Sequence, residues 1–154
     1  MLKTMTPENK ELLLQDLCAR LPYDLQVKIV EDDEPYTLLS AHPNKDIALI
    51  GIDMGGVYAT SKVKIDTIKP YLRPMSSMTK EEREEMYNLL SPEGTAIYGN
   101  DGIALPLNHC GEFVPYEFMN RIIQYLLEHH FDFMGLIPKD LAIEVTESNN
   151  PYKE

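Results

Sequence analysis

The sequence has no tryptophan, only two cysteines and no long apolar run. Cys18 and Cys110 stand far apart and form no metal-type pair, and no signal peptide precedes the first apolar segment. Free thiols in a reducing compartment are therefore expected. No apolar run approaches the roughly 18 residues that a membrane span needs. The sequence therefore predicts a cytoplasmic protein that does not enter a membrane.

Basic residues are scarce as well. Lys and Arg number 14 against 25 Asp and Glu, which gives a net charge of −11. This is the wrong sign for neutralising phosphates, so direct binding to nucleic acid is not expected. An acidic surface suits docking on a basic protein, including by imitation of nucleic acid. We therefore expect a protein partner, of basic character.

The short motifs of common cofactor sites are missing. The acidic run Glu31–Glu34 lacks the alternating ligands and central glycine of a calcium loop, and a solvated turn explains it. The glycines within Gly51–Gly56 lack the spacing of a phosphate loop, and a two-glycine turn explains them. There is no G-x-S-x-G, His-x-x-x-His or Cys-x-x-Cys motif. No cofactor and no metal are predicted.

A small enzyme stays open as the alternative, using either Cys110 or a cluster of His109, His129 and His130. Cys110 follows His109, although adjacent side chains usually point apart and thiol catalysis needs a histidine arranged in space. His129 and His130 end a predicted helix, where histidines interact favourably with the helix dipole. Together with Asp132 they are candidate metal ligands, but neighbours on a helix splay apart. A helix terminus is the simpler interpretation.

The composition that is present is that of a globular domain. The 154 residues are 44% hydrophobic and 25% charged, which is enough apolar material for one core. We predict a single domain over residues 1–145, followed by a flexible polar tail over residues 146–154.

Three helices are predicted from apolar spacing and capping signals. Thr6 is a good N-cap with Pro7 at the first helical position, and this helix ends before Pro22. Thr79 and Glu82 form a capping box at the start of the second helix, residues 80–90. The third and longest helix is predicted over residues 115–130, with a wide apolar stripe.

Alternating apolar residues and short turns predict the strands. Four strands joined by turns of four to six residues are typical of an antiparallel meander: residues 25–30, 36–41, 47–52 and 57–65. A hairpin over residues 95–98 and 103–107 follows, and then a short last strand or an extended segment over residues 141–145. The predicted fold class is α+β: this meander of about four strands plus the hairpin in the C-terminal half, with the three helices packed on one face.

The segment between the meander and the second helix carries the one locally basic patch. Pro70 and Pro74 forbid a regular helix there and predict an irregular, stiff joint. Around it, four cations and one aromatic side chain, with Asp66 as the only acid, form the candidate binding surface: Lys62, Lys64, Lys69, Tyr71 and Arg73. The alternative is that Tyr71 and Leu72 simply pack against the end of the sheet.

Three stretches resemble one group of proteins. They are ELLLQDLCARLPYDLQVKI near the N-terminus, IKPYLRPMSSMTKEE in the middle and EHHFDFMGLIPKDLAIEVTESNNPY near the C-terminus. They are similar to segments of small uncharacterised proteins of gut Bacteroidales and of their phages and mobile elements, in the same order. The resemblance implies a bacterial or phage cytoplasm and an accessory role, and it brings no catalytic residues. With no catalytic constellation recognised, we predict a non-enzymatic interaction or regulatory protein.

Overall fold

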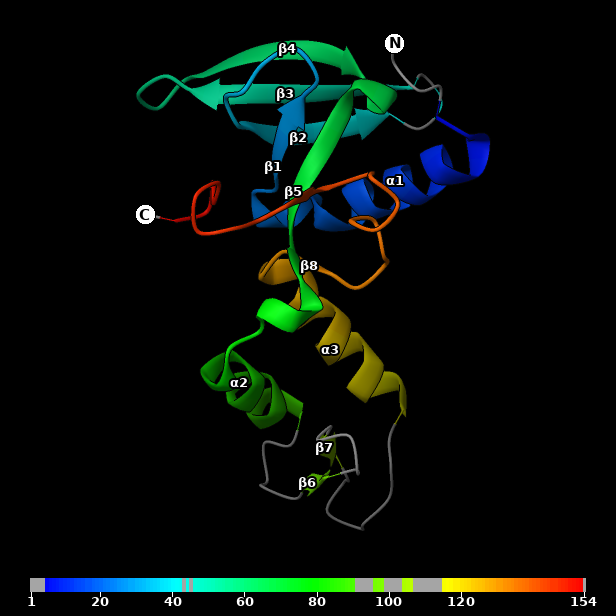
Figure 1. Ribbon diagram of the computed structural model, residues 1–154, viewed down its shortest axis with the longest axis vertical. Helices are drawn as coiled ribbons and strands as arrows, with labels where there is room; N and C mark the ends of the chain where they lie inside the picture. The colour runs from blue at the N-terminus through cyan, green and yellow to red at the C-terminus, as the bar shows by residue number, and fades with distance from the viewer. Residues whose placement is uncertain are drawn as a thin grey trace. The chain divides into compact units, whose positions relative to one another are not determined.

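The computed structural model describes residues 5–42, 44, 46–90, 96–98, 104–106 and 115–153 (Figure 1). Within the predicted single domain, the chain forms two compact units. Unit 1 comprises Met1–Pro74 and His130–Glu154, and unit 2 comprises Met75–His129. Unit 2 therefore interrupts unit 1 in the sequence.

A meander of antiparallel strands opens the sheet of unit 1, as predicted. Its strands are β1 (Gln26–Ile29), β2 (Tyr36–His42), β3 (Ile47–Asp53) and β4 (Tyr58–Lys64). The sheet continues beyond the meander, in the order β4-β3-β2-β1-β5-β8, with β9 paired to β5. The α+β class and the antiparallel meander are confirmed, and β4 forms one edge of the sheet.

The prediction of an irregular joint after the meander is wrong. Residues 68–74 form β5 (Ile68–Pro74), which pairs antiparallel with β1 and parallel with β8 (Phe131–Asp132) and β9 (Ile143–Glu144). Prolines do forbid a helix here, but they favour extended geometry in the residue before them, and a strand satisfies both constraints. β9 confirms the short last strand.

Helix α1 (Pro7–Arg20) covers one face of this sheet. Thr6 caps it as predicted, because its Oγ1 accepts a hydrogen bond of 3.2 Å from the Asn9 amide. The core between helix and sheet is aliphatic and includes Leu13, Leu17, Leu25, Val27, Leu38, Ala48, Ile50, Ile65, Ile68 and Leu72. Figure 1 shows α1 on one side of β1 and β2.

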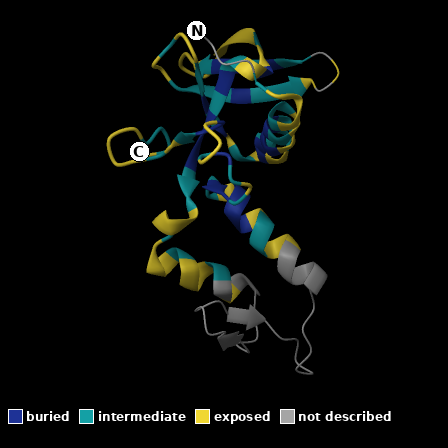
Figure 2. Ribbon diagram, turned by 45° about the vertical axis from the view of Figure 1, so that its right-hand side comes forward, coloured by how far each residue is buried: buried dark blue, intermediate teal, exposed yellow. Residues whose placement is uncertain are grey.

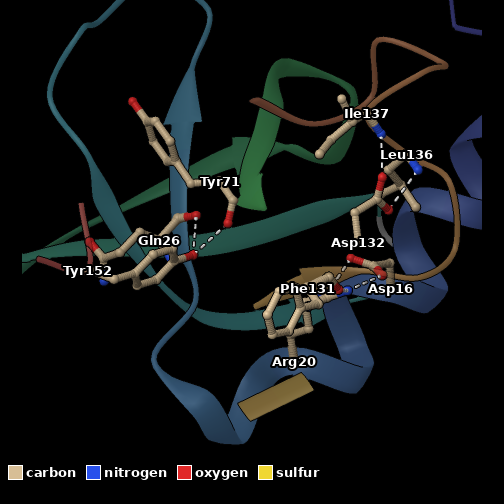
Figure 3. Close-up of polar contacts among 9 residues, drawn as sticks. All are labelled: Asp16, Arg20, Gln26, Tyr71, Phe131, Asp132, Leu136, Ile137 and Tyr152. Carbon is tan, nitrogen blue, oxygen red and sulfur yellow. Dashed lines mark hydrogen bonds and ion pairs between the residues drawn. The ribbon is translucent and has the colours of Figure 1, made fainter. Parts of the chain in front are cut away.

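An ion pair lies buried beside this core (Figure 3). Arg20 donates to the carboxylate of Asp16 at 2.8 and 3.1 Å, and both side chains have no exposed surface. A further bond of 2.6 Å runs from Arg20 to the carbonyl oxygen of Phe131. Asp132 accepts bonds from the amides of two residues in the following turn, Leu136 and Ile137. The pair therefore ties α1 to the chain at β8, far away in sequence.

Where a flexible tail is predicted, the structure has defined contacts. The hydroxyl of Tyr152 accepts from the amide of Gln26 at 3.1 Å and donates to the carbonyl of Tyr71 at 2.7 Å (Figure 3). The ring of Tyr152 stacks on that of His130, with centroids 3.8 Å apart. Burial raises the pKa of the Tyr152 phenol, which keeps it protonated as a donor. One aromatic residue thus anchors a polar segment across two strands.

Replacing Tyr152 by phenylalanine is expected to lower the free energy of unfolding by roughly 1–3 kcal/mol, because two backbone groups lose their partner. Urea denaturation followed by circular dichroism measures this loss. Tyr23→Phe is the matched control and should change stability by less than about 0.5 kcal/mol. Equal values for the two variants would show that the hydroxyl bonds of Tyr152 add nothing to stability.

Unit 2 contains η3 (Met75–Ser77), α2 (Lys80–Leu90), α3 (Pro115–Glu128) and an antiparallel pair, β6 (Ala96–Tyr98) with β7 (Ala104–Pro106). The capping box is confirmed: Thr79 and Glu82 exchange two bonds of 3.1 Å between side chain and amide. Tyr125 on α3 donates to Glu85 on α2 at 3.0 Å. The pairing of β6 with β7 confirms the predicted hairpin strands.

Candidate functional site

The face of β2, β3 and β4 that lies opposite α1 is named here the open face. On β3, Ala48 and Ile50 are buried in the core. Since side chains alternate along a strand, Ile47, Leu49 and Gly51 lie on the other side. Ile47 and Leu49 are half-buried there. This side therefore has an apolar floor.

The register of the strands sets cations around this floor. Leu49 pairs with Lys62, and Ile47 pairs with Lys64 on one side and His42 on the other. His42, Ile47, Leu49 and Lys62 line a hollow of about 110 Å³. A second hollow of about 250 Å³ lies beside it at the strand edge, lined by Asp46, Ile47, Lys62, Val63 and Lys64. Both volumes are below the roughly 300–1,000 Å³ typical of small-molecule sites. The open face thus presents a shallow apolar strip with a basic border.

A glycine lets the apolar residues close over the middle of the face. A Cβ atom at Gly51 would lie 2.9 Å from Cδ1 of Leu39 and 3.2 Å from Cδ1 of Tyr58. Contacts under 3.0 Å force a neighbour to shift, so Leu39 and Tyr58 occupy the space above Gly51. Tyr58 still has 45% of its surface exposed. The strip therefore continues from Leu49 toward the end of the hairpin.

The turn between β3 and β4 carries two of the most exposed apolar side chains among the described residues. Met54 is 68% exposed and Val57 is 71% exposed. The turn is ordered, since the Met54 amide donates to the Val57 carbonyl at 2.7 Å and the Gly56 amide donates to Asp53 at 2.7 Å. Gly55 and Gly56 supply the positive φ angles, which confirms the predicted two-glycine turn. The protein holds apolar groups in water on a defined turn.

The lysines of the open face form no ion pair with any residue that the structure describes. Both Lys62 and Lys64 are exposed on β4, which Figure 2 colours mostly as exposed. The nearby acid Asp46 is engaged by Lys10, and this hydrogen bond raises the pKa of the Lys10 ammonium. The open face is therefore a local positive surface on a chain of net charge −11.

The structure places the five residues of the predicted binding surface on two separate strands. Lys62 and Lys64 lie together on β4, whereas the other three lie on β5, beyond β3, β2 and β1 in the sheet. Lys69 pairs with Asp140 at 2.9 Å, and Tyr71 is only 7% exposed. Burial also raises the pKa of the Tyr71 phenol. Arg73 lies over the ring of Phe131, 4.2 Å from its centroid. Tyr71 and Leu72 are buried, as the packing alternative expects, but they lie within the sheet as part of β5 and not against its end.

The residues of the alternative enzymatic site divide into three groups. His109 and Cys110 lie outside the described residues. His129, in unit 2, stacks on Tyr125, and its Nδ1 lies 3.0 Å from the Tyr125 carbonyl. His130, in unit 1, has a left-handed backbone with φ of 63°. Within the described ranges no cluster of three or more His, Cys, Asp or Glu side chains has the geometry to hold a metal ion.

Sequence reasoning missed the apolar part of the site. Met54, Val57 and Tyr58 were interpreted only as turn and strand residues. Their position was the available signal. Turns are rich in Gly, Asn, Asp and Ser, so apolar residues on both sides of two turn glycines are unusual. The close approach over Gly51 depends on the register of three strands, which no short sequence pattern specifies.

Comparison of the chain with protein-family models, with curated proteins and with solved structures found no match. Among the helices that the structure describes, none combines the length and the apolar character needed to cross a membrane.

Proposed function

We propose that this chain is a non-enzymatic interaction protein that belongs to a bacterium or to its mobile elements. It acts as an accessory regulator in the bacterial cytoplasm. Its contact surface is the open face with the adjoining turn. The observation that carries the proposal is the pair of apolar side chains, Met54 and Val57, held in water at the end of an ordered hairpin. Exposed apolar groups that border a patch of charge are typical of protein contact sites.

The shape of the open face supports a protein partner over a small substrate. Its hollows, of about 110 and 250 Å³, are small, and residues of β2, β3 and β4 line them together with Asp46. An extended partner can lie along such a strip and reach the turn residues at its end. Lys62 and Lys64, which form no ion pair with a described residue, favour acidic groups on the partner. This revises the expected partner, which the overall acidity alone predicts to be basic.

Affinity capture from a gut Bacteroidales lysate tests this proposal. The wild-type protein is compared with Lys62→Glu/Lys64→Glu and with Met54→Ser/Val57→Ser. We expect each double variant to recover at least tenfold less of a specific partner, because the first reverses the charge and the second removes apolar contact. Quantitative mass spectrometry of the captured proteins gives the ratio.

The matched control is Lys139→Glu/Lys153→Glu, which makes the same change in net charge at exposed residues away from the open face. It should capture the partner at the wild-type level. Capture that is equal for all variants, or a turnover activity of the purified protein without a partner, would contradict the proposal.

A further inference from the structure

The hydrogen bonds at the two ends of the β3–β4 pair define which backbone groups face outward. The Met54 amide donates to the Val57 carbonyl, and the Ile65 amide donates to the Asp46 carbonyl at 3.2 Å. Both pairs belong to the register that joins Ile47 to Lys64. In an antiparallel pair, hydrogen-bonded and non-hydrogen-bonded positions alternate.

On β4 this alternation gives two sets of residues. Residues 59, 61 and 63 point their amides and carbonyls toward β3. Tyr58, Thr60, Lys62 and Lys64 point theirs away from the sheet. The carbonyl of Lys64 is used, because it accepts from the Thr67 hydroxyl at 2.6 Å. The stretch Tyr58–Lys62 therefore has outward backbone groups with no hydrogen bond to a described residue.

The residues with outward backbone groups also carry the side chains of the open face. Lys62 and Lys64 lie on that face beside Leu49 and Ile47, and Tyr58 lies over Gly51. A strand added along β4 would place every second side chain next to these lysines. Its remaining side chains would lie on the side of Ala59, Ser61 and Val63, where Val63 packs on the core.

We propose that an acidic, extended segment of the partner protein adds to the sheet as a strand along β4, with its acidic side chains beside Lys62 and Lys64. This rests on the proposed function and specifies its partner: acidic residues alternating with apolar ones. Lysines on an edge strand hinder pairing with strands that lack acidic groups. A second copy of this chain fits poorly, because pairing β4 with β4 gathers the lysines of both copies at one seam.

A synthetic peptide is the direct probe. It has seven residues, the length of β4, with glutamate alternating with valine. We expect it to bind the wild-type protein and to slow hydrogen exchange of the Thr60 and Lys62 amides at least tenfold, with little change at Ser61. Nuclear magnetic resonance measures this alternation residue by residue. A control peptide with lysine in place of glutamate should not bind.

Thr60→Pro removes one outward amide while leaving the amides that bond β3 in place. We expect it to weaken peptide binding at least tenfold, whereas Thr60→Val keeps the amide and should bind like the wild type. A peptide N-methylated at alternate residues tests the same bonds without altering the protein, so a folding defect of Thr60→Pro leaves the test intact. The N-methylated peptide should not bind the wild-type protein.

Several results would overturn strand addition. They are an absence of peptide binding to the wild type, equal binding of the methylated peptide, or a concentration-dependent dimer in light scattering that Thr60→Pro abolishes. A partner captured by Thr60→Pro but lost with Lys62→Glu/Lys64→Glu would overturn strand addition and leave the proposed function standing. Capture that is unaffected by the lysine variants would instead contradict the proposed function.

Discussion

Replacing Arg20 by methionine is expected to lower the free energy of unfolding by roughly 3–5 kcal/mol at neutral pH. Asp16 and Arg20 have no exposed side-chain surface, so the variant leaves a carboxylate buried without its partner. The carbonyl of Phe131 loses its donor in the same step. Urea denaturation of the two proteins measures the difference.

The loss should depend on pH. Burial raises the pKa of the Asp16 carboxyl, while Arg20 opposes this shift. Without Arg20, the folded pKa lies further above the unfolded value of 3.8. A carboxyl whose pKa is higher in the folded state favours folding while it is protonated, below its unfolded pKa. This contribution is lost as the pH rises through its folded pKa. The difference between Arg20→Met and wild type should therefore be smaller at pH 4 than at pH 7.

Two controls separate charge from packing. The double variant Asp16→Leu/Arg20→Met removes both charges and should recover most of the stability, because apolar residues of similar volume replace buried ion pairs well. Arg83→Met, on an exposed position of α2, should change stability by less than about 0.5 kcal/mol. A loss for Arg20→Met that is the same at both pH values would contradict an ionised Asp16 as its cause.

Replacing Leu72 by alanine is expected to lower the free energy of unfolding by roughly 2–5 kcal/mol. Leu72 has no exposed surface and belongs to the core of unit 1. Its carbonyl accepts from the Val145 amide at 2.8 Å, which joins β5 to the C-terminal strand. Guanidinium denaturation followed by tyrosine fluorescence measures the change.

Val30→Ala is the control for Leu72→Ala, since Val30 is an aliphatic residue with 46% of its surface exposed. It should cost well under 1 kcal/mol. A comparably small loss for Leu72→Ala would mean that residues 68–74 form a surface joint and not an interior strand.

Local signals predicted the local structure well. The cap at Thr6 and the capping box at Thr79 and Glu82 act over three residues, and hydrogen bonds of 3.1 to 3.2 Å confirm both. The meander was predictable because short turns permit only antiparallel neighbours. β5 was not predictable in this way, since its partners β8 and β9 follow more than 50 residues later.

The candidate site was predictable only in part. Lys62 and Lys64 were found through charge, because a cluster of lysines stands out in a chain of net charge −11. Lys69 and Arg73 share the same signal, yet an acid and a ring elsewhere in unit 1 engage them, which sequence proximity cannot reveal. Met54 and Val57 carry no charge signal, and their exposure depends on the hairpin extending beyond the core.

The parallel pairing of β5 with β8 and β9 has a consequence for synthesis on the ribosome. β5 is complete at Pro74, but its partners emerge only after Met75–His129 has been translated. At 5–20 residues per second the edge of β5 waits roughly 3–11 s for them. During that interval an apolar strand is available for wrong pairing. The nascent chain is therefore most exposed to aggregation while unit 2 is being made. Early folding of unit 2 does not shorten this interval, because its length is set by translation.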